Sequence, residues 1–410
     1  MKRIWFVSHY SMPPEYEMRI KTQMFARYFQ DQGVETKIFS ASTIHNTAIN
    51  LIADGSLYIE REYEGLNFVH IRCENYTGNG LKRIINMRQF ARRFPRAAKN
   101  FPLPDVIVAD VNCVNYKPIA RFCRKHNIKF YVDVRDLWPL SMVEYRLISE
   151  KNPLTRYLYR QERRMYTVAD GLIFAMEGGL EYLAEKGWDT SRGGPVDPAK
   201  VFHINNGVDM EAFAYNREHH PHPDEHLDDP ELFTAVYVGS IRTVNAVDQI
   251  VEAAVLTKDP RIRYLIWGDG DQAEGLKKRC ADEQITNVVF KGFTDKREIP
   301  SIVSRAGVNL LNSGDSGAMR FGGSLNKMFD YFAAGKPVIQ NFSMAHSLIE
   351  KYNCGIIVEH TSEAMAAAVE RVSEMPADEY ARYCENAKKA AGDFDYRLLA
   401  EKLAKIVDNS

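Results

Sequence analysis

The sequence has no long apolar segment and only six cysteines. None of its apolar stretches approaches the roughly 20 residues that a membrane-spanning helix needs. The cysteines are scattered without a Cys-x-x-Cys pair, which favours free thiols over a disulfide framework or a zinc site. The early apolar run from Ile4 to Val7 is too short for the core of a signal peptide. We therefore expect a cytoplasmic protein.

The chain also lacks a strong net charge and a P-loop. Its formal net charge is -1, so no overall field attracts nucleic acid, and we expect no nucleic acid partner. The absence of Gly-x-x-x-x-Gly-Lys-Ser/Thr excludes a P-loop NTPase. With 410 residues and 45% hydrophobic content, the chain is long enough for two domains with sizeable cores.

Strand-like and helix-like segments alternate in both halves of the sequence, which predicts parallel sheets covered by helices. The predicted strands are 4–7, 35–40, 106–110, 129–134 and 171–175, then 234–238, 264–267, 288–291, 308–312, 337–341 and 356–358. A polar, proline-broken stretch between Phe213 and Pro230 predicts a linker, whose histidines we expect in a solvated loop rather than a metal site. We predict an α/β protein with two Rossmann-like domains whose parallel sheets face a central cleft. The predicted parts are an N-terminal domain (1–215), a linker (216–232), a second domain (233–392) and a C-terminal helix (393–410).

The most informative stretch, Ser324 to Ile339, predicts a helix that Gly335 ends. At about 100° per residue, Asn326, Lys327 and Asp330 share the face opposite an apolar stripe. The N–H groups at a helix start attract an anion, Lys327 adds a cation, and Asp330 can accept hydrogen bonds from two hydroxyls. This combination indicates a site for a nucleotide diphosphate sugar, although an ordinary amphipathic surface helix has the same periodicity.

The same stretch reads Ser-Leu-Asn-Lys-Met-Phe-Asp-Tyr-Phe-Ala-Ala-Gly-Lys-Pro-Val-Ile and resembles a helix of family-four retaining glycosyltransferases. Arg-Asp-Leu-Trp-Pro at 135–139 and Asn-Gly-Val-Asp at 206–209 are also similar to segments of members that build bacterial polysaccharides, capsules and O-antigens. The resemblance implies the GT-B fold and a retaining, metal-independent transfer of a hexose from a nucleotide diphosphate sugar to a glycan acceptor. It implies no cofactor, a lipid-linked acceptor and work at the inner face of the cell membrane. A sugar-nucleotide 2-epimerase of the same fold and a non-catalytic sugar-nucleotide-binding subunit remain alternatives.

In this family, loops that follow strands of the second domain contact the donor. The implied donor-binding residues are Ser324, Asn326, Asp330, Gly239, Gly268 and Phe293. Arg242 and Lys327 are implied to stabilise the departing diphosphate, although Arg242 could also be a solvated surface residue. The sequence departs from the family at Asn245-Ala246, where Lys-Gly or Gln-Gly is usual, and at Gly322, where an acid is usual. We interpret Asp-Gly-Asp at 269–271 as a turn near the nucleotide rather than a metal site.

The first domain has candidates in two loops. Arg135 and Asp136 follow a predicted strand, and the resemblance places them near the anomeric carbon as catalytic residues; an ion pair that caps the next helix is the alternative. Tyr10, Glu15 and Arg19 lie in the loop after the first strand and are candidates for holding acceptor hydroxyls.

The segment from Leu81 to Lys99 is basic and contains no acid. Its apolar and basic residues segregate on opposite sides of a helix, which is typical of an interfacial membrane anchor. Pro95 is expected to end or bend this helix. We predict that Arg88, Arg92 and Arg93 contact an anionic membrane surface, with a solvated basic face as the alternative.

Overall fold

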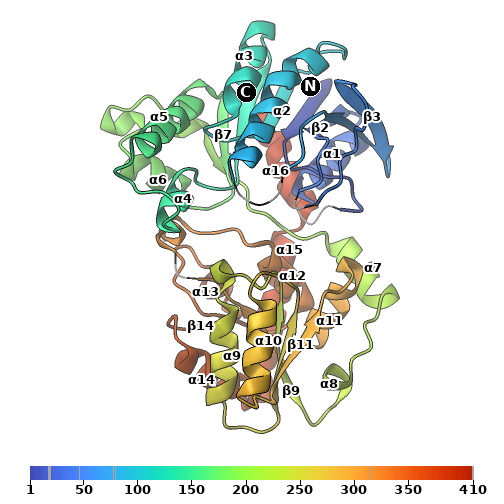
Figure 1. Ribbon diagram of the computed structural model, residues 1–410, viewed down its shortest axis with the longest axis vertical. Helices are drawn as coiled ribbons and strands as arrows, with labels where there is room; N and C mark the ends of the chain where they lie inside the picture. The colour runs from blue at the N-terminus through green and yellow to red at the C-terminus, as the bar shows by residue number, and fades with distance from the viewer. Residues whose placement is uncertain (17–19, 46, 77, 79, 315, 409–410) are drawn as a thin grey trace. The chain divides into compact units, whose positions relative to one another are not determined.

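The chain folds into two compact units, each built on its own sheet (Figure 1). The structure is a computed structural model that describes residues 1–16, 20–45, 47–76, 78, 80–314 and 316–408. The first unit comprises Met1–Asn205 with Tyr396–Ser410, and the second comprises Asn206–Asp395. The N-terminal segment of the first unit therefore ends at residue 205, whereas the sequence predicted a boundary at residue 215. The second unit begins there, without an intervening linker.

The first unit contains an eight-stranded sheet in the order β3-β4-β2-β1-β5-β6-β7-β8. Its strands are β1 (Arg3–Ser8), β2 (Glu35–Ala41), β3 (Tyr58–Tyr63), β4 (Leu66–Ile71), β5 (Val106–Asp110), β6 (Lys129–Val134), β7 (Gly171–Phe174) and β8 (Val201–His203). Its helices are α1 (Lys21–Asp31), α2 (Leu81–Ala98), α3 (Tyr116–His126), α4 (Leu140–Glu144), α5 (Pro153–Val168), α6 (Gly179–Glu185) and α16 (Tyr396–Asp408), with short 3-10 turns η1 (Thr190–Arg192) and η2 (Pro198–Lys200). The strands pair in parallel except β3 and β4, which form an antiparallel edge.

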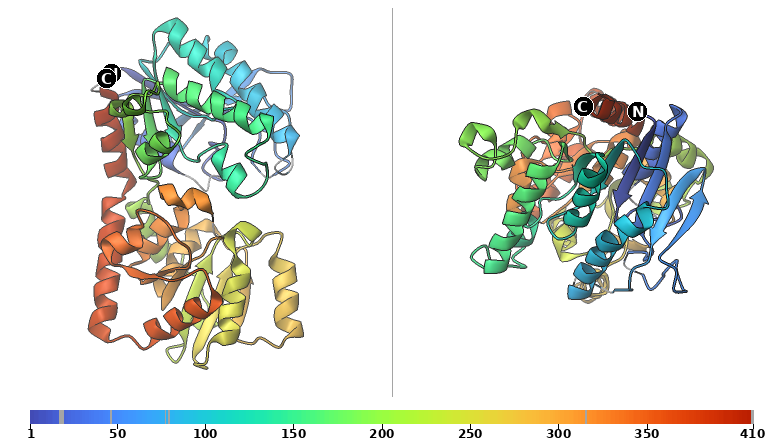
Figure 2. Two further views of the ribbon diagram at one scale, coloured as in Figure 1. Left: turned by 90° about the vertical axis from the view of Figure 1, so that its left-hand side faces the viewer. Right: turned by 90° about the horizontal axis from the view of Figure 1, so that it is seen from above.

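Neighbouring residues of β1 point to opposite faces of this sheet and identify the helices that cover each face. The Trp5 ring contacts Phe94 of α2 and Phe122 of α3, with centroids 6.4 and 6.5 Å apart. The Phe6 ring contacts Phe29 of α1 at 6.1 Å. Helices α2 and α3 thus cover one face and α1 the other, where α16, dark red in Figure 2, packs against α1.

The second unit contains a six-stranded, fully parallel sheet in the order β11-β10-β9-β12-β13-β14. Its strands are β9 (Phe233–Val238), β10 (Ile262–Trp267), β11 (Val288–Gly292), β12 (Val308–Leu311), β13 (Val338–Gln340) and β14 (Gly355–Ile357). Its helices are α7 (Met210–His219), α8 (Glu225–Asp228), α9 (Val247–Leu256), α10 (Ala273–Asp282), α11 (Ile299–Arg305), α12 (Asn326–Ala334), α13 (Leu348–Tyr352), α14 (Ser362–Ser373) and α15 (Ala377–Asp393), with 3-10 turns η3 (Thr243–Asn245), η4 (Lys296–Glu298) and η5 (Gly317–Phe321). Tyr237 and Ile266 pack in the core on one face, and Val236 and Trp267 pack in the core on the other. The sheet is therefore buried on both faces, as parallel sheets require.

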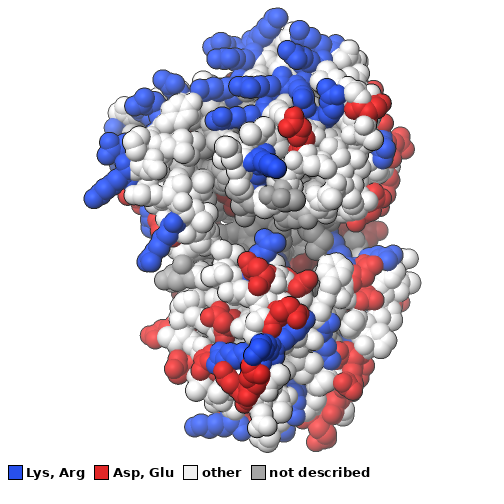
Figure 3. Space-filling model, viewed as in Figure 1, with Lys and Arg blue, Asp and Glu red and all other residues white. Residues whose placement is uncertain are grey.

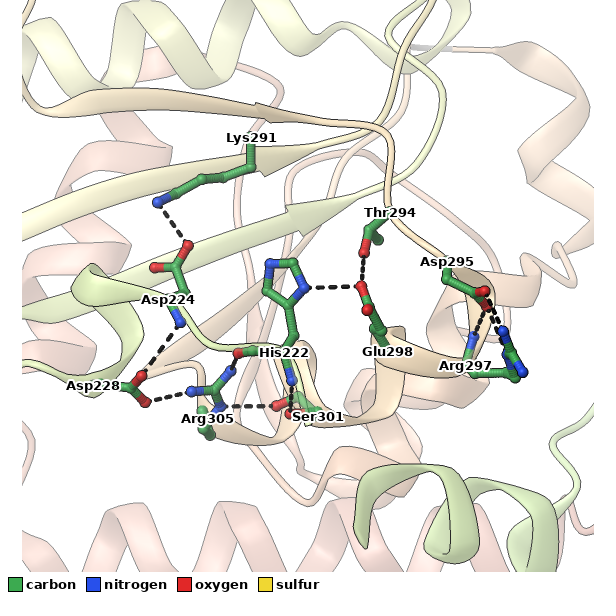
Figure 4. Close-up of polar contacts among 10 residues, drawn as sticks. All are labelled: His222, Asp224, Asp228, Lys291, Thr294, Asp295, Arg297, Glu298, Ser301 and Arg305. Atoms are coloured by element: carbon green, nitrogen blue, oxygen red, sulfur yellow. Dashed lines mark hydrogen bonds and ion pairs between the residues drawn. The ribbon is translucent and has the colours of Figure 1, made fainter. Parts of the chain in front are cut away.

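The predicted linker belongs to the second unit, because α7 and α8 both pack against α11. A hydrogen bond of 2.9 Å joins His222 Nδ1 to Glu298 Oε2, and Lys291 Nζ lies 2.6 Å from Asp224 Oδ2 (Figure 4). The Arg305 guanidinium also pairs with the carboxylate at the end of α8. The prediction of a solvated histidine loop is therefore wrong for His222, since long-range polar contacts hold this stretch in place.

The basic segment forms α2, and most of its apolar side lies in the protein core, although Leu81 and Ile85 in its first turns are exposed. Met87, Phe90 and Phe94 are at most 1% exposed, so they cannot enter a membrane as the prediction of an interfacial helix required. The helix also continues through Pro95 to Ala98 rather than ending at the proline. No helix in the described part of the chain is both long and apolar enough to cross a membrane.

Candidate functional site

Three glycine turns meet where β9, β10 and β11 end in the second unit. The N–H of Gly239 donates to Trp267 O at 3.0 Å, and that of Gly268 donates to Gly292 O at 2.8 Å. The φ angle of Gly268 is 135°, and a Cβ there would lie 1.8 Å from Gly239 O. Only glycine can occupy that position, because an L side chain would meet both backbone strain and a clash. Backbone contacts therefore lock the two predicted donor loops to each other.

Lys327, in the first turn of α12, extends its side chain towards the carboxyl end of β9. Its ammonium donates to Tyr237 Oη at 3.1 Å and to Asn312 O at 3.3 Å, and it lies 4.4 Å from the Tyr237 ring centroid. Burial lowers the pKa of Lys327 to about 7. None of the ion pairs among the described residues involves Lys327. The ammonium is thus a partly desolvated cation without a carboxylate partner, which suits it to an incoming anion.

Helix α12 begins at Asn326, two residues after the predicted start. Leu325 occupies the N-cap position in an extended conformation and makes no side-chain cap. The Ser324 hydroxyl instead accepts from the Asn206 N–H at 2.8 Å, and the Asn206 side-chain amide donates to Ser324 O at 2.7 Å. The N–H groups of the first turn therefore have no side-chain cap, which leaves them available to an anionic ligand.

Asp330 lies one turn beyond Lys327 and is partly exposed. Burial raises the pKa of its carboxyl group to about 6, and the charge of Lys296 acts against this rise. The next residue, Tyr331, fixes α12 to the sheet, because its hydroxyl accepts from the Val238 N–H at 3.0 Å. This bond fixes the position of the neighbouring Asp330 relative to the sheet. The Asp330 carboxylate takes up a proton and loses its charge in mild acid.

Two further predicted donor residues lie on the surface of this unit. Arg242 is exposed, and the Phe293 side chain is 81% exposed directly after β11. The unusual pair Asn245-Ala246 has a structural role, because the Asn245 amide donates to Ser240 O at 2.7 Å and Asn312 donates to Ala246 O at 2.5 Å. These bonds close the turn before α9 without the glycine that the resemblance led us to expect.

In the first unit, Arg135 belongs to a buried ionic network at the ends of β5 and β6. Its Nε lies 2.9 Å from Asp133 Oδ2 and 3.6 Å from Asp110 Oδ2. Lys21, which is 1% exposed, donates to Asp133 Oδ1 at 3.2 Å and to Ile204 O at 2.9 Å. Sequence reasoning missed Lys21 and Asp110, because no local pattern links either of them to the Arg135 loop.

This network corrects the predicted alternative of a helix-capping pair. Arg135 pairs with Asp133 and Asp110, and α4 has no side-chain cap at its start. Asp136 is exposed, whereas Arg135 is half-buried. Asp136 is therefore the better placed of the two predicted catalytic residues to meet a ligand.

The acceptor-side candidates are unevenly placed. Tyr10 Oη accepts from Arg83 Nε at 2.6 Å, and the Tyr10 ring lies 5.1 Å from the His45 ring. Glu15 is exposed, and Arg19 lies outside the described residues. Tyr10 thus has aromatic and cationic neighbours from α2 and from the loop after β2.

The comparison with known families identifies the second unit. Residues 220–390 match the sequence model of the family described as glycosyl transferases group 1. The second unit is a group 1 glycosyltransferase domain. None of the curated protein sequences matches the chain.

Solved glycosyltransferase structures match the chain along nearly its whole length. Sucrose-phosphate synthase from Thermosynechococcus elongatus has 17% identity and a TM-score of 0.73, covering 100% of this chain and 99% of that one. HepE from Anabaena, in complex with UDP and glucose, has 14% identity and a TM-score of 0.69, covering 100% of both chains. WaaG, a glycosyltransferase involved in lipopolysaccharide biosynthesis, has 14% identity and a TM-score of 0.65, covering 99% of this chain and 100% of that one. The predicted fold class, GT-B with two Rossmann-like domains, is confirmed.

The group 1 glycosyltransferase domain thus collects several anion-binding features at one edge of its sheet. They are the Lys327 ammonium, the uncapped first turn of α12 and the backbone of the glycine turns. Asp330 adds a hydroxyl acceptor one helical turn away. This arrangement suits a ligand that combines a diphosphate with a sugar diol.

Proposed function

We propose that the protein transfers a hexose from a nucleotide diphosphate sugar to a glycan acceptor, with retention of configuration at the anomeric carbon. The observation that carries the proposal is the Lys327 ammonium, without a carboxylate partner among the described residues, at the uncapped start of α12 in a group 1 glycosyltransferase domain. HepE, a structural neighbour, has been crystallised with UDP and glucose and with UDP-glucose, which supports a donor of this chemical class.

The proposed chemistry is mainly electrostatic. The bond between the anomeric carbon and the diphosphate breaks, and the acceptor hydroxyl forms the new bond on the same face of the sugar. The acceptor proton leaves with the diphosphate. Lys327, Arg242 and the N–H groups of α12 stabilise the negative charge that develops on the leaving group. Asp330 accepts hydrogen bonds from the ribose hydroxyls, and the exposed Phe293 ring offers a surface for the base.

A donor screen followed by a transfer assay tests this proposal. Thermal shift across nucleotide diphosphate sugars should reveal the donor, because a ligand at 100 times its dissociation constant adds about 2.7 kcal/mol of stability. The labelled donor is then incubated with the protein and a membrane extract. Label in a glycan product supports the proposal. An isomerised donor would indicate an epimerase, and binding without either product would indicate a non-catalytic subunit.

The pH dependence of donor binding should have two limbs. Binding requires protonated Lys327, whose pKa is about 7 in the free protein, and ionised Asp330, whose pKa is about 6. Affinity should therefore peak between about pH 6 and 7. Above this range it should fall up to about tenfold per pH unit, because binding must then take up a proton.

Titration calorimetry with the donor from pH 5 to 9 measures both limbs. Lys327→Ala should flatten the alkaline limb, and Asp330→Asn should flatten the acid limb while weakening binding at neutral pH. Identical pH profiles for the wild type and both variants would remove Lys327 and Asp330 from the donor site.

Transfer should not need a divalent metal, since the proposed counter-charges are Lys327, Arg242 and a helix end. Activity measured in excess EDTA should equal activity without it. Loss of activity with EDTA and recovery with Mn²⁺ would instead indicate a metal at Asp269 and Asp271. The Asp269 carboxylate accepts from the Gly270 N–H at 2.7 Å.

We further propose that the acceptor is a lipid-linked glycan of a bacterial surface polysaccharide and that the protein works at the inner face of the cell membrane. The fold is shared with WaaG, a glycosyltransferase involved in lipopolysaccharide biosynthesis. Because most of the apolar side of α2 is buried, contact with the membrane would be mainly electrostatic and would use the exposed Arg88 and Arg92. Arg93 is less suitable, since its Nη1 donates to Arg72 O at 2.5 Å.

Changing Arg88 and Arg92 together to Glu should weaken binding to anionic vesicles at least about 30-fold, since each cation near such a surface contributes about 1 kcal/mol. Vesicle sedimentation at low salt measures the change. The matched control changes the exposed Arg382 and Lys389 of α15, in the second unit, to Glu. This control should bind the vesicles as the wild type does. Equal binding of all three proteins would show that α2 is only a solvated basic face.

A further inference from the structure

Helices α2, α3 and α5 of the first unit give it a strongly basic surface, visible in Figure 3 as Lys and Arg gathered over these helices. The cations of the three helices are Lys82, Arg83, Arg88, Arg92, Arg93, Arg96, Lys117, Arg121, Arg124, Lys125, Arg156, Arg160, Arg163 and Arg164. The only acid in these helices is Glu162. The surface charge is therefore almost entirely of one sign.

Glu162 does not offset this charge, because it is buried beneath α5. Its carboxyl oxygens accept hydrogen bonds from the hydroxyls of Tyr166 and Tyr182, each at 2.8 Å. Burial raises the pKa of Glu162 to about 8, so the group is largely uncharged at neutral pH. Cations are thus the only charged side chains on the outer side of α5.

A hollow of about 540 Å³ lies between α3 and α5 within this basic surface. Its lining includes the cations Lys117, Arg121, Arg124, Lys129 and Arg164. Among the described residues, only Lys129 of these five forms an ion pair, with Asp170 at 3.9 Å. Asp170 is the one carboxylate of the lining, and it also accepts from the Phe130 N–H at 2.8 Å. Within the described part of the chain, the other four cations of the hollow therefore have no counter-charge.

Tyr116 is one of the buried residues that line the hollow, and its side chain is 4% exposed. Burial raises the pKa of Tyr116, and the charges of Arg164 and Arg121 act against this rise. Arg121 of α3 and Arg164 of α5 both line the hollow, so each helix contributes a guanidinium group to it. The two cations therefore come to one cavity from different helices, an arrangement that suits an anion bound by both.

The hollow is separate from the candidate site of the same unit. Lys129 starts β6, and Asp170 precedes β7, so the hollow lies at the amino ends of these parallel strands. Arg135 and Asp136 follow the carboxyl end of β6. The hollow and the candidate site therefore lie at opposite ends of the strands of one sheet. The acceptor chemistry proposed above does not require the hollow.

We propose that the hollow between α3 and α5 is a binding site for a ligand that carries clustered phosphate groups. Arg121 and Arg164 hold the phosphates from the two walls, Lys117 and Arg124 add charge, and the Tyr116 hydroxyl donates from the base. Clustered phosphates fit because planar guanidinium groups bind phosphate oxygens in pairs. The ligand is either a soluble diphosphate or a phospholipid headgroup, and the two sources are distinguished below.

The test compares the wild type with two double variants of equal charge change. Arg121→Glu with Arg164→Glu reverses both walls of the hollow. Lys125→Glu with Arg163→Glu reverses two cations of the same helices that do not line it. Radiolabelled inorganic pyrophosphate is measured by equilibrium dialysis with excess UDP present to occupy a donor site. Sedimentation with vesicles of phosphatidylcholine and phosphatidylglycerol forms the second arm.

Reversing the charges of Arg121 and Arg164 should weaken pyrophosphate binding at least about tenfold, while the control variant should bind as the wild type does. If the wild type binds only vesicles, a loss confined to the hollow variant supports the site with a lipid headgroup as its ligand. Equal loss in both variants would overturn the proposal, since the basic surface would then act as a whole. Binding of neither probe by the wild type would overturn it as well. Circular dichroism confirms that the variants are folded. UDP contributes no readout, so failure here leaves the proposed transferase activity unaffected.

Discussion

Replacing Lys327 with alanine should lower kcat/KM for glycosyl transfer by about 30- to 900-fold, equivalent to roughly 2 to 4 kcal/mol of transition-state stabilisation. The loss follows from the position of the ammonium at the start of α12, where no carboxylate of the described residues pairs with it. An alanine would remove one of the cations that we propose to stabilise the departing diphosphate. Steady-state kinetics with the donor found by thermal shift would measure the effect, and kcat should carry much of it.

Lys336→Ala is the matched control, because Lys336 lies just beyond the other end of the same helix. It should retain wild-type kinetics. The Lys327 variant should also keep its stability, since removal of a buried cation relieves a desolvation cost. Wild-type kcat/KM in Lys327→Ala would refute the assignment of this residue to the diphosphate.

Gly268→Ala should destabilise the second unit by about 2 to 5 kcal/mol and abolish detectable donor binding. The alanine Cβ would lie 1.8 Å from Gly239 O at a φ of 135°, so both glycine loops would have to move. These loops follow the carboxyl ends of β9 and β10, where the Lys327 side chain also lies. The midpoint of urea unfolding and the donor affinity together measure the effect.

Gly275→Ala provides the contrast within the same unit. Gly275 lies inside α10, and an alanine Cβ there would have no atom of the described residues within 4 Å beyond its own helix backbone and chain neighbours. The substitution should therefore stabilise the helix by up to about 1 kcal/mol. If Gly268→Ala unfolded at the same urea concentration as the wild type, the loops would be more adaptable than their contacts indicate.

Sequence patterns located the strands well where both faces are buried. Strands β5 and β6 have the predicted limits, and all but one residue of each is buried. Strands β3, β4 and β8 were missed. β3 is an edge strand whose Glu60, Arg61 and Glu62 are exposed, and β8 is an edge strand of three residues, but β4 is largely buried. The GT-B fold could thus be predicted from the buried strands and the α12 motif. Of the edge strands, β11 and β14 of the second sheet were predicted, whereas β3 and β8 of the first sheet were not.

The site was only partly predictable for a related reason. Asn326, Lys327 and Asp330 are close in the sequence, so helical periodicity alone places them together. Tyr237 and Asn312, which hold Lys327, come from two other strand ends, and no local pattern links them to α12. The same holds for the Asn206 contact with Ser324 just before α12. Long-range polar contacts are what single-sequence reasoning could not supply.

The position of α16 constrains the order in which the molecule can be completed during synthesis. The Tyr396 ring of α16 packs edge-on against Phe25 of α1, with centroids 6.3 Å apart, and Tyr131 Oη donates to Ile406 O at 3.4 Å. The ribosome must therefore make the whole second unit before the outer side of α1 can be covered. The nascent first unit carries an uncovered apolar surface throughout that interval, whereas the second unit has all its residues in one continuous segment.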